Sequence, residues 1–210
     1  MKAPSIFIET YKLLMEATEE SLAGSLDNCH APGLFSLSIN CTEKRKTRIF
    51  MAKRSINPFD VAFHTHRYPL TIAVICGRLT HHTASTVQSF KTAARISQWS
   101  YVSPLSDMES DFLGLKYEKE VEVFFDDYHM PPGSRISLEP DDFHTVSCPA
   151  GTMWIRQEGK SADSPSKVLG VPFNTNGLYT LPNLNEINKN KDLAASELKK
   201  LISEYVIADL

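Results

Sequence analysis

Short stretches of alternating apolar and polar residues, separated by turns rich in glycine and proline, recur along this 210-residue chain. They are found at 34–41, 70–76, 117–125 and 152–156. A period of two is the pattern of a strand with one buried face. An amphipathic pattern with helical spacing stands on each side of them, at 6–26 and 192–208. Many short strands with one helix at each end favour a closed or double-sheet β-barrel over alternating strands and helices.

We expect these elements to form a single domain over residues 1–210. Its parts are an N-terminal helix and hairpin at 1–56, a barrel core at 57–159 and a loop followed by a helix at 160–210. Within the core, residues 83–116 are rich in Ser and Thr and weakly periodic, so they are predicted to be an insertion with short strands at best. A loop in this position would be suited to gating access to a site.

The bulk composition is that of an ordinary folded protein, with 42% apolar and 22% charged residues. A net charge of −3 provides no field that recruits nucleic acid or anionic membranes non-specifically. No apolar run approaches the ~20 residues of a membrane span, and the N-terminus lacks the apolar segment of a signal peptide. The four cysteines form no CxxC pair. We therefore expect a cytoplasmic protein without a nucleic-acid or membrane partner.

Three histidines in alternating segments stand out as candidates for chemistry. His64 and His66 are two residues apart, so on an extended strand their imidazoles point to the same side. His144 lies in a later strand-like segment that follows a Pro-Pro-Gly turn. Two imidazoles on one face reach a single metal ion, and a third from a neighbouring strand completes the set. Histidines on half-buried strands also serve as hydrogen-bonded packing residues, and this alternative stays open.

The segment that begins with His64-x-His66 resembles the first motif of the cupin family. In that motif an HxH pair is followed by a glutamate and then by a glycine. Here Leu70 stands in the glutamate position and Gly77 in the glycine position. The ligand carboxylate that the family usually carries is therefore absent from this motif.

The later segment resembles the second cupin motif, which runs from a glycine through a proline to a histidine. Gly133 and His144 have the eleven-residue separation of that motif, although Asp141 stands where its inner glycine usually lies. The resemblance spans roughly residues 57–158, about half the chain. It implies a mostly β fold, the cupin-type double-stranded β-helix or jelly-roll barrel, with the N- and C-terminal helices added to it.

By this resemblance, His64, His66 and His144 form a three-histidine set similar to the metal sites of thiol dioxygenases. Such a set implies a divalent metal, with Fe(II) as the first choice and Zn or Ni as occupants after purification. Neutral imidazoles without a carboxylate favour Fe, Ni, Cu or Zn over Mg or Ca.

Three functions follow from the resemblance. The first is an iron-dependent oxidoreductase, a non-heme Fe(II) dioxygenase that acts on a small polar molecule. The alternative is a cupin that binds a small molecule, such as a nucleotide or sugar derivative, without turnover, which Leu70 in place of glutamate favours. The third is a metal-dependent isomerase or lyase. No GxSxG, P-loop or dinucleotide fingerprint supports another enzyme class. Whether the chain is an enzyme stays open, and cupin-like barrels often pair through their sheet edges into a homodimer.

Further residues are candidates for supporting roles. His81 and His82 follow Gly77, and one of them faces inward if the strand continues, as an additional ligand or as a residue that contacts a ligand from behind. An arginine at the pocket mouth would bind a carboxylate or phosphate through two parallel hydrogen bonds. The candidates for substrate binding are Arg67, Tyr68, Arg135, Arg156 and Trp154.

Overall fold

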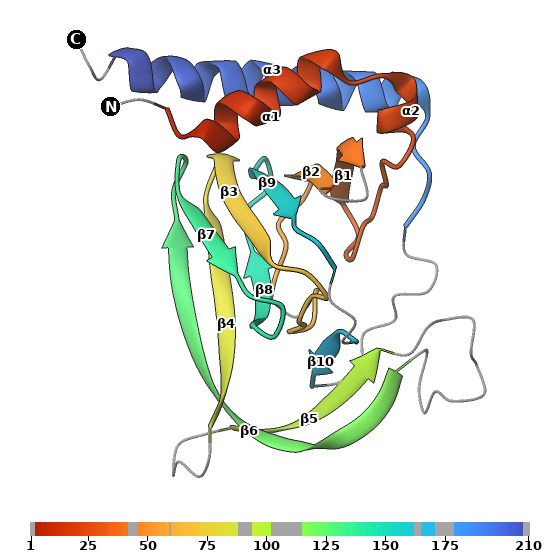
Figure 1. Cartoon of the computed structure of the whole chain (residues 1–210), viewed down its shortest axis with the longest axis vertical. Coiled ribbons are helices and arrows are strands. Elements are labelled where there is room, and N and C mark those ends of the chain that lie inside the picture. Colours follow the sequence, from red (N-terminus) through yellow and green to blue (C-terminus); the bar gives the residue numbers. More distant parts are fainter. Residues whose placement is uncertain are drawn as a thin grey trace.

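Two antiparallel five-stranded sheets face each other in a barrel-shaped arrangement (Figure 1). The computed structural model describes residues 3–41, 46–58, 60–87, 94–101, 115–161, 165–170 and 179–207. The first sheet has the order β1 (Leu34–Cys41), β2 (Lys46–Ala52), β9 (Met153–Glu158), β3 (Leu70–Cys76) and β7 (Arg135–Leu138). The second has the order β10 (Lys167–Leu169), β5 (Ala94–Tyr101), β6 (Leu115–Met130), β4 (Leu79–Val87) and β8 (Phe143–Ser147).

Apart from β7, the strands of the first sheet bury both of their faces. In β3, Ile72 and Val74 point between the two sheets, while Ala73 and Ile75 point to the opposite face. On that outer face, α1 (Ser5–Glu16) and α3 (Leu184–Ile207) lie side by side over the sheet (Figure 1). Two apolar layers therefore enclose the sheet, one under the helices and one inside the barrel. No helix in the described ranges is long and apolar enough to cross a membrane.

Two motif glycines occupy positions where the backbone requires glycine. Gly77 has φ +78° at the corner between β3 and β4, and a Cβ there would lie 2.8 Å from Thr152 Cα. Gly133 has φ +84° in the turn between β6 and β7, where its N–H donates to Val74 O at 2.9 Å. A positive φ is strained for residues with a side chain, so these corners depend on glycine.

The predicted fold class is confirmed, since the chain is mostly β with a helix at each end. The hairpin of β1 and β2 forms as predicted. The first helix is shorter than the prediction of 6–26, because Thr18 caps a separate short helix, α2 (Glu19–Leu22), and Leu26 pairs with Ser36 of β1. The last helix begins earlier than predicted, at Leu184, where the Asn183 side chain accepts a hydrogen bond from the Glu186 N–H.

Residues 83–116, which the sequence pattern sets apart as an insertion, contribute to the second sheet. They contain the end of β4, all of β5 and the beginning of β6. The strand β5 pairs with β6 and also with β10, so it is an integral part of this sheet. The remainder of the stretch, 88–93 and 102–114, lies outside the described residues.

Candidate metal centre

The three histidines singled out by the sequence lie together inside the barrel. The extended segment that carries His64 and His66 is not a regular strand, but it runs beside β8. There His64 N–H donates to His144 O and His144 N–H donates to His64 O, both at 3.0 Å. This reciprocal pair puts the two side chains on one face, and His66 follows two residues later. The potential ligand nitrogens of the three side chains all lie within 4.8 Å of one another.

Hydrogen bonds select which nitrogen of each ring is available to a metal. His64 Nδ1 lies 2.8 Å from Ala62 O, so Nδ1 carries the proton and leaves the Nε2 lone pair free. His144 Nδ1 lies 3.1 Å from His81 Nε2, and a proton on this Nδ1 likewise leaves the His144 Nε2 lone pair free. His66 presents its own Nε2 at 2.9 Å from His144 Nε2. The Nε2 atoms of His66 and His144 therefore meet, a ring nitrogen of His64 lies within 4.8 Å of them, and Ala62 and His81 orient two of the rings.

The His66–His144 pair has the spacing of two ligands on one divalent ion. Two nitrogens at right angles on one ion, each about 2.1 Å from it, are about 3.0 Å apart, close to the His66–His144 separation of 2.9 Å. Among the described residues, no carboxylate or thiol joins these histidines in the group able to hold a metal. A ligand set of three neutral imidazoles suits Fe, Ni, Cu or Zn rather than Mg or Ca.

Burial keeps these imidazoles neutral. Burial lowers the pKa of His64 from 6.5 to about 4, against a hydrogen bond to Ala62 that raises it. Burial likewise lowers the pKa of His66 and of His144 well below the ordinary value, and the charge of Arg156 adds to this effect at both. A neutral imidazole is the form that donates a lone pair to a metal, so the site is ready to bind at neutral pH.

The neighbouring histidines of β4 occupy opposite faces of the second sheet. His81 is fully buried and its Nε2 faces His144, while its Nδ1 has no hydrogen-bond partner in the described part of the chain. His82 points away, where its Nδ1 lies 2.6 Å from Asp127 Oδ1 and its Nε2 lies 2.7 Å from Ser147 Oγ. The structure thus brings His81, and not His82, to the site, in a position behind one of the ligands.

The missing motif glutamate has a counterpart on the adjacent strand. Leu70 is buried in the apolar core inside the barrel, as its side chain requires. Directly opposite it in the register of β3 and β9 is Glu158, which is 4% exposed and bonded to the guanidinium of Arg156. Glu158 is not part of the metal-binding group, so this carboxylate serves Arg156 instead. Sequence reasoning missed Glu158, although it shares the face of β9 with Arg156.

Two of the proposed substrate-binding residues lie next to the histidines. The Tyr68 ring stacks on His66 with 5.2 Å between ring centroids, and Arg156 Nη2 donates to the Tyr68 hydroxyl at 3.5 Å. The Arg156 guanidinium also lies over the Phe50 ring, 5.1 Å from its centroid. Tyr68 and Arg156 therefore form a polar wall beside the cluster.

The other three substrate-binding candidates lie elsewhere. Trp154 is 3% exposed and stacks on Phe50 within the core, which makes it a packing residue. Arg67 and Arg135 are exposed on the surface of the protein. The alternation of residues along a strand could not have predicted that Arg156 is buried while Arg67 and Arg135 are exposed. Exposure depends on where each segment lies in the folded barrel.

One more histidine, which no sequence pattern singled out, approaches the site from the loop before β1. The His30 ring stacks on His64 at 6.1 Å and on Phe50 at 6.4 Å. Burial, with a smaller contribution from the charge of Arg156, lowers the pKa of His30 to about 3. Its backbone is left-handed, with φ 67°, which is uncommon outside glycine.

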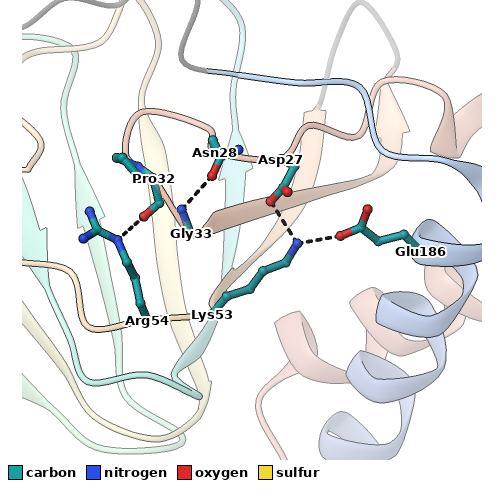
Figure 2. A network of polar contacts seen from close by, with 7 residues as sticks. All are labelled: Asp27, Asn28, Pro32, Gly33, Lys53, Arg54 and Glu186. Carbon is teal, nitrogen blue, oxygen red and sulfur yellow. Dashed lines mark hydrogen bonds and ion pairs between the residues drawn. The ribbon is translucent and has the colours of Figure 1, made fainter.

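A network of polar contacts holds this loop in place, and Figure 2 shows its members. Gly33 N–H donates to Asn28 Oδ1 at 2.8 Å, closing the turn that contains His30. Lys53 Nζ bonds both Asp27 Oδ1 at 2.9 Å and Glu186 Oε1 at 2.6 Å (Figure 2). The first of these acids belongs to the loop and the second to α3.

The same network continues at the far end of the loop, where Arg54 Nε donates to Pro32 O (Figure 2). Both ends of the loop therefore contact Lys53 and Arg54, the two residues that follow β2. Lys53 also connects this segment to α3. These contacts position the His30 ring against the cluster.

Comparisons with known proteins found similar solved structures but no related sequence. No family model and no curated protein sequence matches the chain. Similar solved structures include KdgF from Halomonas sp. (10% identity, 62% of this chain and 82% of that chain, TM-score 0.36). Another is an RmlC-like cupin from Shewanella frigidimarina (11% identity, 62% of this chain and 79% of that chain, TM-score 0.35). A third is hydroxypropylphosphonic acid epoxidase from S. wedmorenis (12% identity, 64% of this chain and 53% of that chain, TM-score 0.38). The chain covers about half of the epoxidase.

Proposed function

We propose that this cupin barrel holds Fe(II) on His64, His66 and His144 and is a non-heme dioxygenase for a small polar molecule. The observation that carries the proposal is the convergence of one ring nitrogen from each of three histidines within 4.8 Å, with the Nδ1 atoms of His64 and His144 facing neighbouring groups. A site with three neutral protein ligands leaves coordination positions open for substrate and O2.

When bound, Fe(II) supplies a centre that activates O2 or polarises a substrate oxygen. The chain's own residues orient the reactants and keep water away from the metal centre. Tyr68, stacked on His66, presents a hydroxyl beside the cluster, and Arg156 presents a fixed positive charge. The apolar interior next to the histidines, which includes Val146 and Trp154, excludes water from the centre.

A second candidate function rests on Leu70. Because the usual motif carboxylate is replaced by a buried apolar side chain, the barrel could bind a small molecule, such as a nucleotide or sugar derivative, without turning it over. A metal-dependent isomerase or lyase ranks third, because cupins of that kind usually retain the glutamate. A cytoplasmic location and a homodimer stay predictions from the sequence.

Oxygen uptake by iron-loaded protein tests the proposal. Small carboxylates, thiols and hydroxy acids are screened with an oxygen electrode, and products are identified by mass spectrometry. We expect substrate-dependent uptake that His144→Ala abolishes and that His129→Ala, a change of an exposed histidine on β6, leaves intact. Equal uptake in both variants contradicts the proposal. Turnover without oxygen on Mn or Zn supports the isomerase or lyase instead, and an unaltered bound metabolite supports the binding barrel.

A further inference from the structure

The inner face of β9 carries charge next to the histidine cluster. Trp154 packs inside the barrel and Ile155 under the helices, so the strand alternates, and Arg156 and Glu158 share the inward face with Trp154. Both charged side chains are largely buried, with 13% and 5% of their side-chain surfaces exposed. Buried charges of this kind are costly unless each has a partner.

A second arginine stands beside this pair. Arg48 of β2 is directly opposite Arg156 in the strand register, so the two guanidinium groups share a face of the sheet. Arg48 Nη1 donates to Gly24 O and Ser36 Oγ, both at 3.0 Å, and neither of these acceptors carries a charge. Like charges placed opposite each other on a sheet are destabilising on their own.

Charge balance in this region is therefore incomplete. Two guanidinium groups, Arg48 and Arg156, face one carboxylate, Glu158. One positive charge is left without compensation among these side chains, before any metal ion is counted. A single negative charge from a ligand would restore the balance.

Arg156 also retains a donor for such a ligand. Its Nη2 is used by Glu158 and by the Tyr68 hydroxyl, but its Nε is buried and has no hydrogen-bond partner among the described residues. The Nε–H is one of the two parallel donors through which a guanidinium binds a carboxylate. An unpartnered buried donor is itself costly, so an acceptor is expected at this position.

We infer that the site takes a small organic monoanion, a carboxylate that binds at Arg156 Nε while the rest of the molecule faces the three histidines. The inference rests on the proposed function and names its substrate class. Tyr68 connects the two parts, because its ring stacks on His66 and its hydroxyl accepts from Arg156. Glu158 holds the guanidinium in place and, by its own charge, disfavours a dianion.

Calorimetry with matched probes tests this inference on the full chain. The probes are lactate, its neutral isostere lactamide, and methylphosphonate as a more highly charged oxyanion. Binding is measured on metal-free and Co(II)-loaded protein. We expect lactate to bind about tenfold or more tightly than lactamide even without metal, because a charge-assisted hydrogen bond is lost with the amide.

Three variants separate recognition from folding. Arg156→Gln/Glu158→Gln removes both charges together and keeps polar side chains at both positions, so it avoids an unpaired buried charge. It is expected to bring the lactate-to-lactamide ratio close to one while circular dichroism and Co(II) absorption stay those of the wild type. Arg156→Lys is expected to lose most of the preference for lactate over lactamide, because lysine lacks the two parallel N–H donors of a guanidinium. Arg95→Gln, a change of an exposed arginine that pairs with Glu122, is expected to retain the preference for lactate.

The outcomes separate carboxylate recognition at Arg156 from the proposed metal-dependent function. An unchanged lactate preference in the double variant, or no preference in the wild type, overturns the inference. Methylphosphonate binding more tightly than lactate overturns the assignment to a monoanion. Absence of Co(II) binding in every protein removes the proposed function, whereas a lactate preference that depends on Arg156 in metal-free protein would still support carboxylate recognition.

Discussion

The Nε2 atoms of His66 and His144 lie 2.9 Å apart although 78 residues separate them in the chain. The reciprocal backbone hydrogen bonds between His64 and His144 produce this proximity, because they align the HxH segment with β8. The site is thus assembled by strand pairing, and the ligand geometry is set when the barrel forms. A site built on paired backbone is better defined than one carried by free loops.

His81 should support metal binding and its sequence neighbour should not. His81→Ala removes the acceptor for His144 Nδ1–H, and we expect the affinity for Zn(II) to fall about 10- to 100-fold. His82→Ala changes a histidine on the other face, where it contacts Asp127, and should leave the affinity unchanged. Competition with a chromophoric chelator measures both affinities.

A further variant separates the hydrogen bond from packing. His81→Gln keeps an acceptor oxygen near His144, so its loss of affinity should fall between those of the wild type and His81→Ala. Equal losses in the His81→Ala and His82→Ala proteins would contradict a role for His81 behind the ligand.

Acid should destabilise the metal-free protein well above the range in which carboxylates titrate. The pKa values of His30, His64 and His81 lie at about 3, 4 and 4 in the folded protein, mainly because of burial, and at 6.5 when these residues are unfolded. As pH falls below about 6.5, the unfolded chain takes up protons that the folded chain does not. The free energy of unfolding should then fall by about 1.4 kcal/mol per pH unit for each such histidine.

Urea unfolding at about pH 7, 6 and 5 measures this slope. His144→Ala, which removes another histidine whose pKa is lowered by burial, should reduce the slope by about one proton. A free energy of unfolding that stays constant between about pH 7 and 5 would show that these imidazoles are not kept neutral by folding.

Two glycines with similar backbone angles should respond differently to alanine. Gly77 and Gly151 have φ +78° and +84°, so each alanine variant is expected to lose about 1–2 kcal/mol from the positive φ alone. At Gly77 the new Cβ would also lie 2.6 Å from Thr152 Oγ1, whereas at Gly151 nothing lies within 4 Å. We expect Gly77→Ala to lose about 3 kcal/mol or more by urea unfolding. Equal losses of unfolding free energy in the two variants would mean that the backbone at Gly77 and Thr152 moves apart without cost.

Asn28 should stabilise the loop that carries His30. Its backbone has φ 54°, a conformation that asparagine tolerates better than alanine, and its Oδ1 accepts from Gly33 N–H. Asn28→Ala should lose about 1–2 kcal/mol and increase hydrogen exchange across residues 27–33. Asn28→Asp keeps the acceptor and should restore most of the protection. Unchanged exchange in the alanine variant would show that the other contacts in Figure 2 suffice.

Local patterns predicted the strands, the barrel and the three histidines, because alternation determines which side chains share a face. They predicted the first helix wrongly, since apolar spacing continues past residue 16 while Thr18 starts a new cap. A pattern of apolar residues does not reveal where a capping side chain outcompetes helix continuation.

The residues that the sequence missed depend on long-range pairing. Glu158 faces Leu70 because β9 lies between β2 and β3, and a strand order of this kind cannot be read from the alternation within each strand. His30 approaches His64 through a left-handed turn, whose course depends on single backbone angles. The positions of Glu158 and His30 could therefore be known only from the three-dimensional structure.

The metal content of the protein tests the proposed three-histidine centre. Protein loaded with Fe(II) without oxygen, then desalted, is analysed by elemental mass spectrometry alongside His144→Ala and His129→Ala. The three-histidine centre predicts one iron ion per chain in the wild type and in His129→Ala, and none in His144→Ala. Iron retained in His144→Ala at the wild-type level, or absent from all three proteins, would contradict a metal centre at these histidines.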